Sequence, residues 1–287
     1  MIKNDKIKGI IFILFAAFGF SLMTFFVRIS GDLPTMQKAF FRNFIALIVA
    51  SFALIKNGNG VHVVKGNRLD LFMRCAFGTS GLIANFYAID RLGIADANML
   101  NKLSPFFAII LSIFILKEVP NKFDIITTII AFIGALFIIR PTGSFVAVFP
   151  ALMGLFGGFG AGTAYVFVRK LGKKGVQAPI IVAAFSLFSC IITLPFLIFN
   201  YVPMTPVQLL YLLLAGVSAS IGQFSITNAY KYAPAKEISV FDYTQVIFAA
   251  LLGMVFFGEV PVLMSIIGYT IIIGVAIVRW QINLRTQ

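Results

Sequence analysis

The sequence predicts an all-α integral membrane protein with ten transmembrane helices. Hydrophobic residues make up 60% of the 287 positions, charged residues make up only 11%, and the mean hydropathy is +1.00. Soluble domains carry about 25% charged residues, so this chain falls outside the globular range. The 33 phenylalanines suit lipid-facing helix surfaces better than a single compact core.

Turn residues and charges divide the chain into apolar segments long enough to cross a bilayer. A helix needs about 20 mostly apolar residues to cross a hydrocarbon core roughly 30 Å thick. The apolar runs are continuous rather than alternating, which argues against membrane strands. The predicted spans are 9–28, 36–55, 69–90, 95–116, 123–140, 147–168, 178–199, 206–231, 236–257 and 262–281. The first span lacks a small-residue cleavage site, so we expect an uncleaved helix rather than a signal peptide.

Basic residues are distributed unevenly between the two ends of these spans. Lys and Arg are enriched in the cytoplasmic loops of membrane proteins. With the N-terminus inside, the cytoplasmic side receives Lys3, Lys6, Lys8, Lys56, Lys65, Arg68, Lys117, Lys122, Arg169, Lys170, Lys173, Lys174, Lys231, Lys236, Arg279 and Arg285. The opposite side receives only Arg28, Lys38, Arg91 and Arg140. The sequence therefore predicts a multi-pass protein of the cytoplasmic membrane with both termini in the cytoplasm.

The two halves of the chain align without gaps at a constant offset of 141 residues. The clearest matches are Phe26-Val27-Arg28 with Phe167-Val168-Arg169, Gly81 with Gly222, and Glu118-Val119-Pro120 with Glu259-Val260-Pro261. We therefore predict two repeats, 1–141 and 142–287, of five helices each. Because five is odd, the second copy enters the membrane inverted. Inverted repeats recur in transporters, with the substrate site near the bilayer midplane between them.

A diffuse motif also relates this chain to a known family. The stretch from Tyr87-Ala88 through Ala95, Ala97, Leu103, Pro105, Leu111 and Glu118 resembles the EamA domain of the drug/metabolite transporter superfamily, and Arg42 fits the same pattern. The resemblance implies a ten-helix secondary transporter whose central cavity is lined by helices of both repeats, including the fourth and ninth. Members of the superfamily move amino acids, nucleotide-linked metabolites, cations and drugs. The second half departs from the pattern, because Val246 stands where the first half has Pro105.

Polar side chains on the fourth and ninth spans form the best candidate substrate site. Ionisable groups within a bilayer are costly and usually face the bundle interior or a wet cavity. Pro105 cannot donate to the carbonyl of Asn101, which leaves a free acceptor beside Lys102 on the same helix face. The repeat places Asn101-Lys102 opposite Asp242-Tyr243; the alternative role of Lys102 and Asp242 is an ion pair that only fixes helix packing. The predicted substrate-binding residues are Asn98, Asn101, Lys102, Asp242, Tyr243, Arg42, Asn85 and Gln223.

The deep charges are mostly basic. Three deep residues, Arg42, Arg74 and Lys102, are basic, and only Asp242 is acidic. This excess of positive charge favours an anionic or zwitterionic metabolite as substrate. Arg74 lies closer to a helix end and has the alternative of snorkelling to the headgroups. Asp242 is the candidate proton-coupling residue, unless Lys102 holds it permanently ionised.

Four residues at the helix ends are candidate gates. Arg28 and Glu259 fall at the predicted outer surface, and their repeat mates Arg169 and Glu118 fall at the inner surface. One interpretation is that two Arg–Glu contacts form alternately and close the outer and inner gates in turn. The other is that each is a solvated helix-end residue that contributes little energy.

These features favour a secondary active transporter of a small polar metabolite, driven by protons or by exchange and working by alternating access. A permease subunit of a nucleotide-driven system and a multidrug exporter are the alternatives. Catalysis is not expected, because the only histidine is His62 and no metal-ligand cluster or hydrolase motif is present. We therefore expect no metal and no cofactor. The net charge of +13 is spread over helix-flanking clusters, so the expected partners are a small-molecule substrate and membrane lipid, without nucleic acid.

Overall fold

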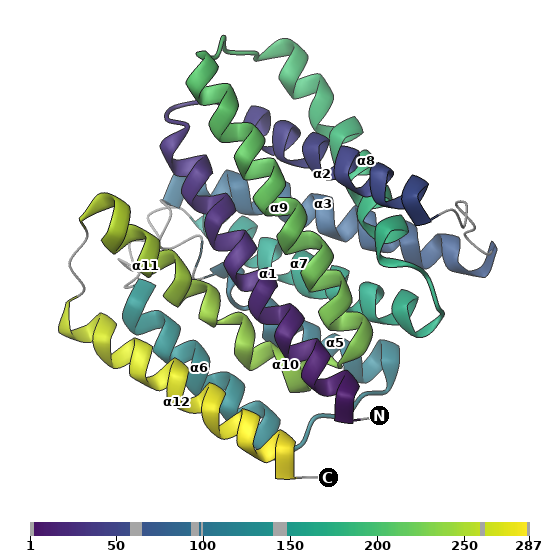
Figure 1. The fold of residues 1–287 in the computed structure, drawn as a ribbon, viewed down its shortest axis with the longest axis vertical. Coiled ribbons are helices and arrows are strands. Elements are labelled where there is room, and N and C mark those ends of the chain that lie inside the picture. Colours follow the sequence, from purple (N-terminus) through teal and green to yellow (C-terminus); the bar gives the residue numbers. More distant parts are fainter. Residues whose placement is uncertain are drawn as a thin grey trace.

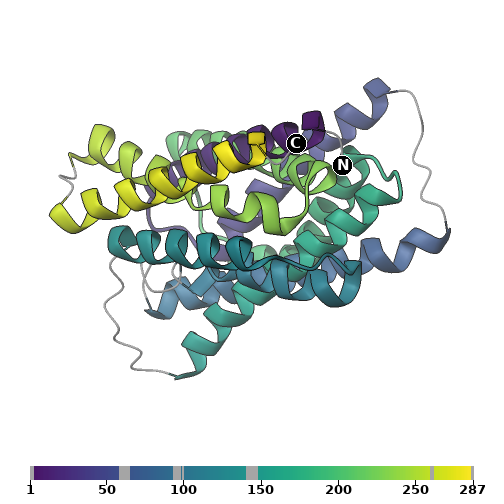
Figure 2. The ribbon, with the colours of Figure 1, turned by 90° about the horizontal axis from the view of Figure 1, so that it is seen from below.

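Every regular element that the computed structural model describes is helical (Figures 1 and 2). The described residues are 3–57, 65–92, 98, 100–139, 148–258 and 262–285. The elements are α1 (Lys3–Ile29), α2 (Thr35–Asn57), the 3-10 turn η1 (Lys65–Asn67), α3 (Arg68–Leu92), α5 (Ser104–Leu116), α6 (Lys122–Ile139), α7 (Val148–Lys173), α8 (Ala178–Phe199), α9 (Pro206–Tyr232), α10 (Ala235–Asp242), α11 (Thr244–Phe257) and α12 (Leu263–Arg285). The prediction of an all-α protein is confirmed for this part of the chain.

The outer surface of the bundle suits a lipid environment. Seven segments are long and apolar enough to cross a membrane: α1, α2, α7, α8, α9, α12 and the combined stretch Ala235–Phe257. Large apolar side chains such as Phe52, Phe114 and Val255 point outward and are 67%, 75% and 74% exposed. Such exposure is costly in water and favourable in lipid, so the chain is a multi-pass membrane protein.

The packing of the helices is symmetric under exchange of the two halves of the chain. The most extensive contacts are α1 with α9 and α3 with α7, followed by α2 with α8 and α6 with α12. The two halves can be compared by equating α1 with α7, α2 with α8, α3 with α9 and α6 with α12. The α1–α9 contact then becomes the α7–α3 contact, while the α2–α8 and α6–α12 contacts remain the same. Figure 1 shows α1 beside α9 and α6 beside α12.

Two glycine crossings show the same symmetry at the level of residues. A Cβ atom on Gly19 of α1 would lie 2.7 Å from the backbone nitrogen of Gly222 of α9. One on Gly160 of α7 would lie 2.7 Å from the Cα atom of Gly81 of α3. Gly19 and Gly160 are 141 residues apart, as are Gly81 and Gly222. Small residues let helix backbones approach this closely within a membrane.

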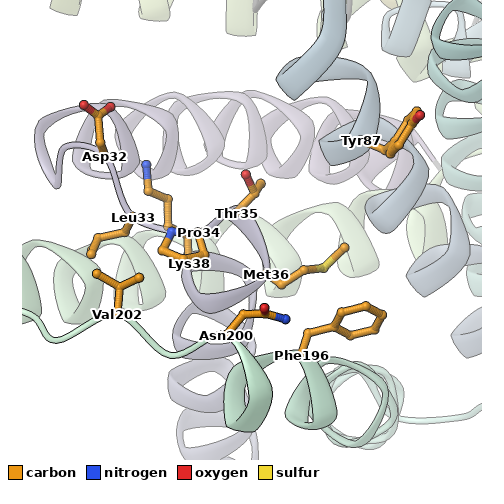
Figure 3. A pocket seen from close by; sticks show the side chains of 10 residues that line it. All are labelled: Asp32, Leu33, Pro34, Thr35, Met36, Lys38, Tyr87, Phe196, Asn200 and Val202. Atoms are coloured by element: carbon orange, nitrogen blue, oxygen red, sulfur yellow. The ribbon is translucent and has the colours of Figure 1, made fainter.

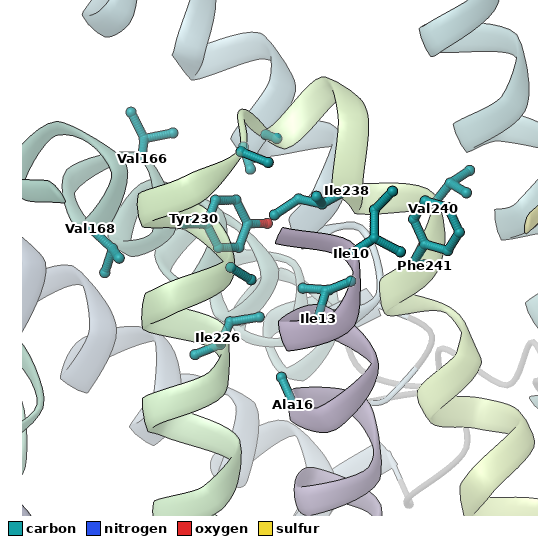
Figure 4. Close-up of a cluster of buried hydrophobic side chains, with 14 of the residues drawn as sticks. Ile10, Ile13, Ala16, Val166, Val168, Ile226, Tyr230, Ile238, Val240 and Phe241 are labelled. Carbon is teal, nitrogen blue, oxygen red and sulfur yellow. The ribbon is translucent and has the colours of Figure 1, made fainter. Parts of the chain in front are cut away.

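The buried apolar core lies between α1, α7, α9 and α10 (Figure 4). Ile10 and Ile13 of α1 pack with Ile226 and Tyr230 of α9 and with Ile238 of α10, and all five are no more than 2% exposed. Both chain termini lie at the same end of the bundle, as Figures 1 and 2 show.

Two spans that the sequence predicts as continuous, 95–116 and 236–257, are interrupted at their centres. The first helix breaks at Lys102 and Leu103 before α5, and the second breaks at Tyr243 between α10 and α11. Positions 102 and 243 are again 141 residues apart. The backbone keeps helical angles at Leu103 (φ −78°, ψ −9°) and Tyr243 (φ −67°, ψ −17°), so each break is a local loss of regular hydrogen bonding rather than a turn.

The two breaks have different chemical causes. Pro105 has no N–H to give the carbonyl of Asn101, which accounts for the first break. The second break lacks a proline, since Val246 occupies the aligned position. There the Thr244 hydroxyl donates to the Phe241 carbonyl at 2.7 Å, and a side-chain bond of this kind competes with the regular helix bonds.

Candidate substrate site

The ammonium group of Lys102 lies at the centre of a buried polar cluster between the two broken helices. It donates to Asp242 Oδ2 at 3.1 Å, to Gln245 Oε1 at 2.7 Å and to the carbonyl oxygen of Asp242 at 3.4 Å. A lysine ammonium has three donors, so all three are used. Lys102 is 8% exposed and Asp242 is 7% exposed. The structure therefore brings these two predicted residues together as a buried ion pair.

Tyr243 completes this cluster from the second helix break. Its hydroxyl donates to the carbonyl oxygen of Lys102 at 3.1 Å. Carbonyl groups freed at a helix break need a partner when they are buried. Each break thus supplies a side chain that satisfies a carbonyl of the other break. Gln245, the third partner of Lys102, was not predicted from the sequence, although it lies three residues after Asp242 and so shares its neighbourhood.

Two tyrosines that sequence reasoning missed connect this cluster to a second one. Tyr165 of α7 stacks on Tyr230 of α9 with ring centroids 4.8 Å apart. Tyr165 lies within electrostatic reach of Asp242, Arg74 and Arg42. No spacing or motif marks Tyr165 in the sequence; only the packing of α7 against α3, α5 and α9 places it there.

The second cluster contains the two arginines of the membrane interior. Arg42 of α2 is 6% exposed and Arg74 of α3 is 2% exposed. Arg74 Nη2 donates to Gln223 Oε1 at 3.3 Å, and its guanidinium carbon lies 4.2 Å from the centroid of the Phe185 ring. The alternative that Arg74 snorkels to the headgroups is wrong, because the side chain is buried among α8 and α9 rather than extended to the surface.

The three predicted asparagines lie beside the clusters rather than within them. Asn85 of α3 packs against Gly157 of α7, and its Oδ1 atom is buried without a hydrogen-bond partner. The carbonyl of Asn98 accepts the N–H of Lys102 at 2.9 Å, and the backbone of Asn101 faces Gly158 of α7. Within the described chain, the side chains of Asn98 and Asn101 make no hydrogen bond to Lys102.

The inner pair of candidate gate residues is in contact. Arg169 Nε donates to Glu118 Oε1 at 3.1 Å, and Lys173 Nζ lies 2.7 Å from the same oxygen. Arg169 Nη1 also donates to the Lys231 carbonyl at 2.8 Å. Of the outer pair, Arg28 lies over the Phe257 ring at 3.9 Å, and Glu259 falls outside the described residues. The interpretation of Arg169 and Glu118 as solvated residues is disfavoured, since their side chains are only 9% and 12% exposed.

The end of the bundle that holds the termini is tied together by further ion pairs between the two halves of the chain. Each of them joins a residue before position 141 to one after it. The pairs are Lys6 with Glu237 at 3.3 Å, Asp70 with Lys170 at 2.8 Å and with Lys174 at 2.6 Å, and Asp124 with Arg279. The halves are therefore closed against each other at this end.

The opposite end carries a hollow of 680 Å³ (Figure 3). Its lining residues come from the loop between α1 and α2, the first turn of α2, the last part of α3, and the end of α8 with the segment that follows it. They are Asp32, Leu33, Pro34, Thr35, Met36, Lys38, Tyr87, Phe196, Asn200 and Val202. Neither Lys102 nor Asp242 lines this hollow, so in this conformation their ion pair is separate from it.

Comparison with known proteins identifies the class of membrane protein. The model of the EamA-like transporter family matches residues 7–140 and again residues 148–280. The chain therefore belongs to the EamA-like transporter family, and the resemblance noted in the sequence is confirmed. Its role is transport, and the small-molecule substrate and membrane setting expected from the sequence agree with this family.

Relatives from bacteria and mammals extend this result. The chain is 29% identical to the pseudopaline exporter CntI of Pseudomonas aeruginosa over 272 residues, which cover 94% of this chain and 95% of the relative. It is 28% identical to an uncharacterized transporter of Helicobacter pylori, over 88% of this chain and 87% of the relative. It is 27% identical to human solute carrier family 35 member G1, over 95% and 80% of the two chains.

The fold has a solved counterpart. A crystal structure of a protein superimposes with a TM-score of 0.86, and the match covers 98% of both chains. The sequence identity is 17%, so this likeness concerns the fold alone.

Proposed function

We propose that this chain is a secondary active transporter that carries a small anionic or zwitterionic metabolite across the cytoplasmic membrane by alternating access. Two inverted five-helix repeats, 1–141 and 142–287, form the moving parts, and both termini lie in the cytoplasm. The Lys102–Asp242 cluster between the broken helices is the substrate site, together with Asn98, Asn101, Tyr243, Arg42, Asn85 and Gln223.

The observation that carries this proposal is the repeated relationship at an offset of 141. A shift of 141 positions between the halves converts the Gly19–Gly222 crossing into the Gly160–Gly81 crossing. The same shift relates the helix breaks at 102 and 243. The family model matches once in each half. Two similar bundles can pack in two alternative arrangements of comparable energy, which is what alternating access requires.

The two ends of the bundle support this mechanism. Ion pairs between the halves close the end that holds the termini, while the other end has the hollow beside Asp32 and Tyr87. Basic residues concentrate at the closed end, which the positive-inside rule assigns to the cytoplasm. The conformation described here is then the one closed to the cytoplasm.

Broken helices support the position of the substrate site. Carbonyl groups freed from regular helix hydrogen bonds are tolerated within a membrane only where they are buried in protein or line a cavity, and transporters bind substrates at such breaks. The name of the Pseudomonas aeruginosa relative makes export the first direction to test.

Transport is tested with the full chain in liposomes that contain no nucleotide. The vesicles are given a defined mixture of amino acids, dicarboxylates, phosphate esters and diamines, and their contents are measured by mass spectrometry with and without a pH gradient. We expect a few anionic or zwitterionic members to accumulate relative to protein-free liposomes. Binding without flux in any gradient would contradict a transporter, and flux restricted to apolar cations would favour a multidrug exporter.

Topology is tested separately with two single-cysteine probes. Val119→Cys lies at the closed end and Asn200→Cys at the end with the hollow, and both positions are exposed. The native Cys75 and Cys190 are buried, so the parent protein supplies a low background. In intact cells an impermeant maleimide should label Asn200→Cys only; labelling of Val119→Cys instead would reverse the proposed orientation.

A further inference from the structure

The two interior arginines differ from the other buried charges of the protein. The cations Lys102, Arg169 and Arg279 are each paired with a carboxylate. Within the described ranges, no carboxylate pairs with Arg42 or Arg74, and the Nε atom of each is buried without a hydrogen-bond partner. Burying a charge is costly unless it is paired and hydrogen-bonded, so these two groups are incompletely satisfied.

The residues around the two arginines do not neutralise their positive charges. Arg42 and Arg74 lie within electrostatic reach of each other, on the helices α2 and α3 that are in contact. The partners identified around them are neutral: the Gln223 amide accepts one hydrogen bond, the Phe185 ring lies against the Arg74 guanidinium, and Tyr165 lies within electrostatic reach of both arginines. Asp242, the carboxylate that shares Tyr165 as a neighbour with the arginines, is already bound to Lys102. Among the residues that the structure describes, no carboxylate therefore neutralises the charge of Arg42 or Arg74.

The fold makes room for this arrangement. A Cβ atom on Gly78, one turn after Arg74 on the same helix, would meet Arg74 Nη1. The Arg74 guanidinium thus lies along its own helix in space that a side chain at position 78 would occupy. Arg42 comes from α2, Gln223 from α9, Phe185 from α8 and Tyr165 from α7, so five helices of both halves converge on the pair.

From these observations we infer that Arg42 and Arg74, with Gln223, form a binding site for an oxyanion of the substrate: a carboxylate or a phosphate group carrying one or two negative charges. A guanidinium presents planar donors that match both groups in a bidentate manner. That this ligand is the transported substrate rests on the proposed transport function. The two arginines would bind the anionic group of the substrate, whereas Lys102 and Asp242 already neutralise each other.

The test measures ligand-induced stabilisation of the purified full chain in detergent. Three four-carbon probes, succinate, putrescine and succinamide, differ in charge but little in length, and glycerol 3-phosphate distinguishes phosphate from carboxylate. Ligand binding to the folded state raises Tm by mass action. We expect succinate or glycerol 3-phosphate to raise Tm at millimolar concentration, and putrescine and succinamide to leave it unchanged.

The variants R42Q and R74Q should each weaken this binding at least about tenfold, because each removes one charge-assisted contact to a buried anion. The control R68Q removes the same charge from an exposed position on α3 and should bind normally. G78A, which retains the charge but displaces the Arg74 guanidinium, should bind more weakly as well. Without ligand, R42Q and R74Q should be at least as stable as the parent protein, since an unpaired buried charge is removed.

The outcomes separate this inference from the proposed function. Anion binding that survives in both R42Q and R74Q, stabilisation by putrescine alone, or no response to any anion would overturn the site. Loss of ligand-free stability in R42Q and R74Q with unchanged anion affinity would make the arginines structural and would also overturn it. Arginine-dependent binding without flux in liposomes would support the site while contradicting transport.

Discussion

Tyr243 donates its phenolic hydrogen to the carbonyl of Lys102, and the ammonium of Lys102 donates to the carbonyl of Asp242, the residue before Tyr243. The two helix breaks, 141 positions apart, are therefore bound to each other through main-chain carbonyls as well as through the ion pair. A contact of this kind holds the two halves together at their centre. Any movement of one half against the other has to exchange these bonds for bonds to water or substrate.

Removing one partner of the central ion pair should destabilise the protein strongly. K102Q or D242N leaves a buried charge without its counterion, which typically costs about 3–5 kcal/mol. The double variant K102Q/D242N removes both charges and should recover most of this loss. Thermal unfolding of the four proteins in detergent measures the coupling. Additive effects of the two substitutions would show that the pair contributes no interaction energy.

The role of Asp242 in proton coupling is tested by uptake rather than by stability. D242N should abolish accumulation driven by an imposed pH gradient, since the position can no longer bind and release a proton. Substrate movement down its own concentration gradient should persist at a reduced rate at equal amounts of folded protein, because Asp242 also belongs to the proposed substrate site. The comparison is made in the same liposomes with and without the gradient. If D242N retains full proton-dependent uptake, Asp242 is not the coupling residue.

The Arg169–Glu118 contact should hold closed the end of the bundle that carries the termini, which we propose to be cytoplasmic. In E118Q the charge that binds both Arg169 and Lys173 is lost, so this end should open more often. The reporter is S239C, a near-isosteric change at a position on α10 that is fully buried in the closed conformation. We expect maleimide to label S239C/E118Q in inside-out vesicles several-fold faster than S239C alone. Equal rates in the two proteins would remove Glu118 from the gate.

The outer pair of Arg28 and Glu259 is tested by charge exchange. R28E and E259R should each reduce transport, because each places two like charges together if the residues meet. The exchanged protein R28E/E259R should regain transport, as the pair is restored with reversed polarity. Transport is measured at equal amounts of folded protein. A double variant no more active than either single one would show that the two residues do not pair.

The glycine crossings should be intolerant of any side chain. G160A places a methyl group against the Cα of Gly81 and the carbonyl of Phe77, and overpacking of this kind typically costs about 1–3 kcal/mol. The matched control is G274A on α12, where a Cβ atom meets no other group. That substitution should be neutral or stabilise by up to about 1 kcal/mol. Unfolding in detergent compares the two; equal stabilities would mean that α3 and α7 can separate freely.

The helical spans could be predicted from the sequence because the length and hydropathy of an apolar run are local properties of the chain. The sequence did not predict the breaks: Pro105 marks the first, but the second arises where Thr244 and Lys102 bond to main-chain carbonyls, and only the packed structure brings Lys102 there. Lys102 and Asp242 were singled out because charge in an apolar span is conspicuous. Tyr165 and Gln245 were missed because a tyrosine or glutamine within a helix is ordinary until its neighbours are known.

Arg42 and Arg74 both belong to the first half, and the positions that align with them in the second half are Ala183 and Ala215. The family model matches both halves, whereas this pair of arginines occurs in one half only. Two arrangements of the backbone related by a two-fold rotation would have equal energies if the copies were identical. Because the repulsion between these guanidinium groups is carried by one copy only, we expect the empty carrier to rest on a preferred side of the membrane, and an arriving anion to lower the barrier to reorientation.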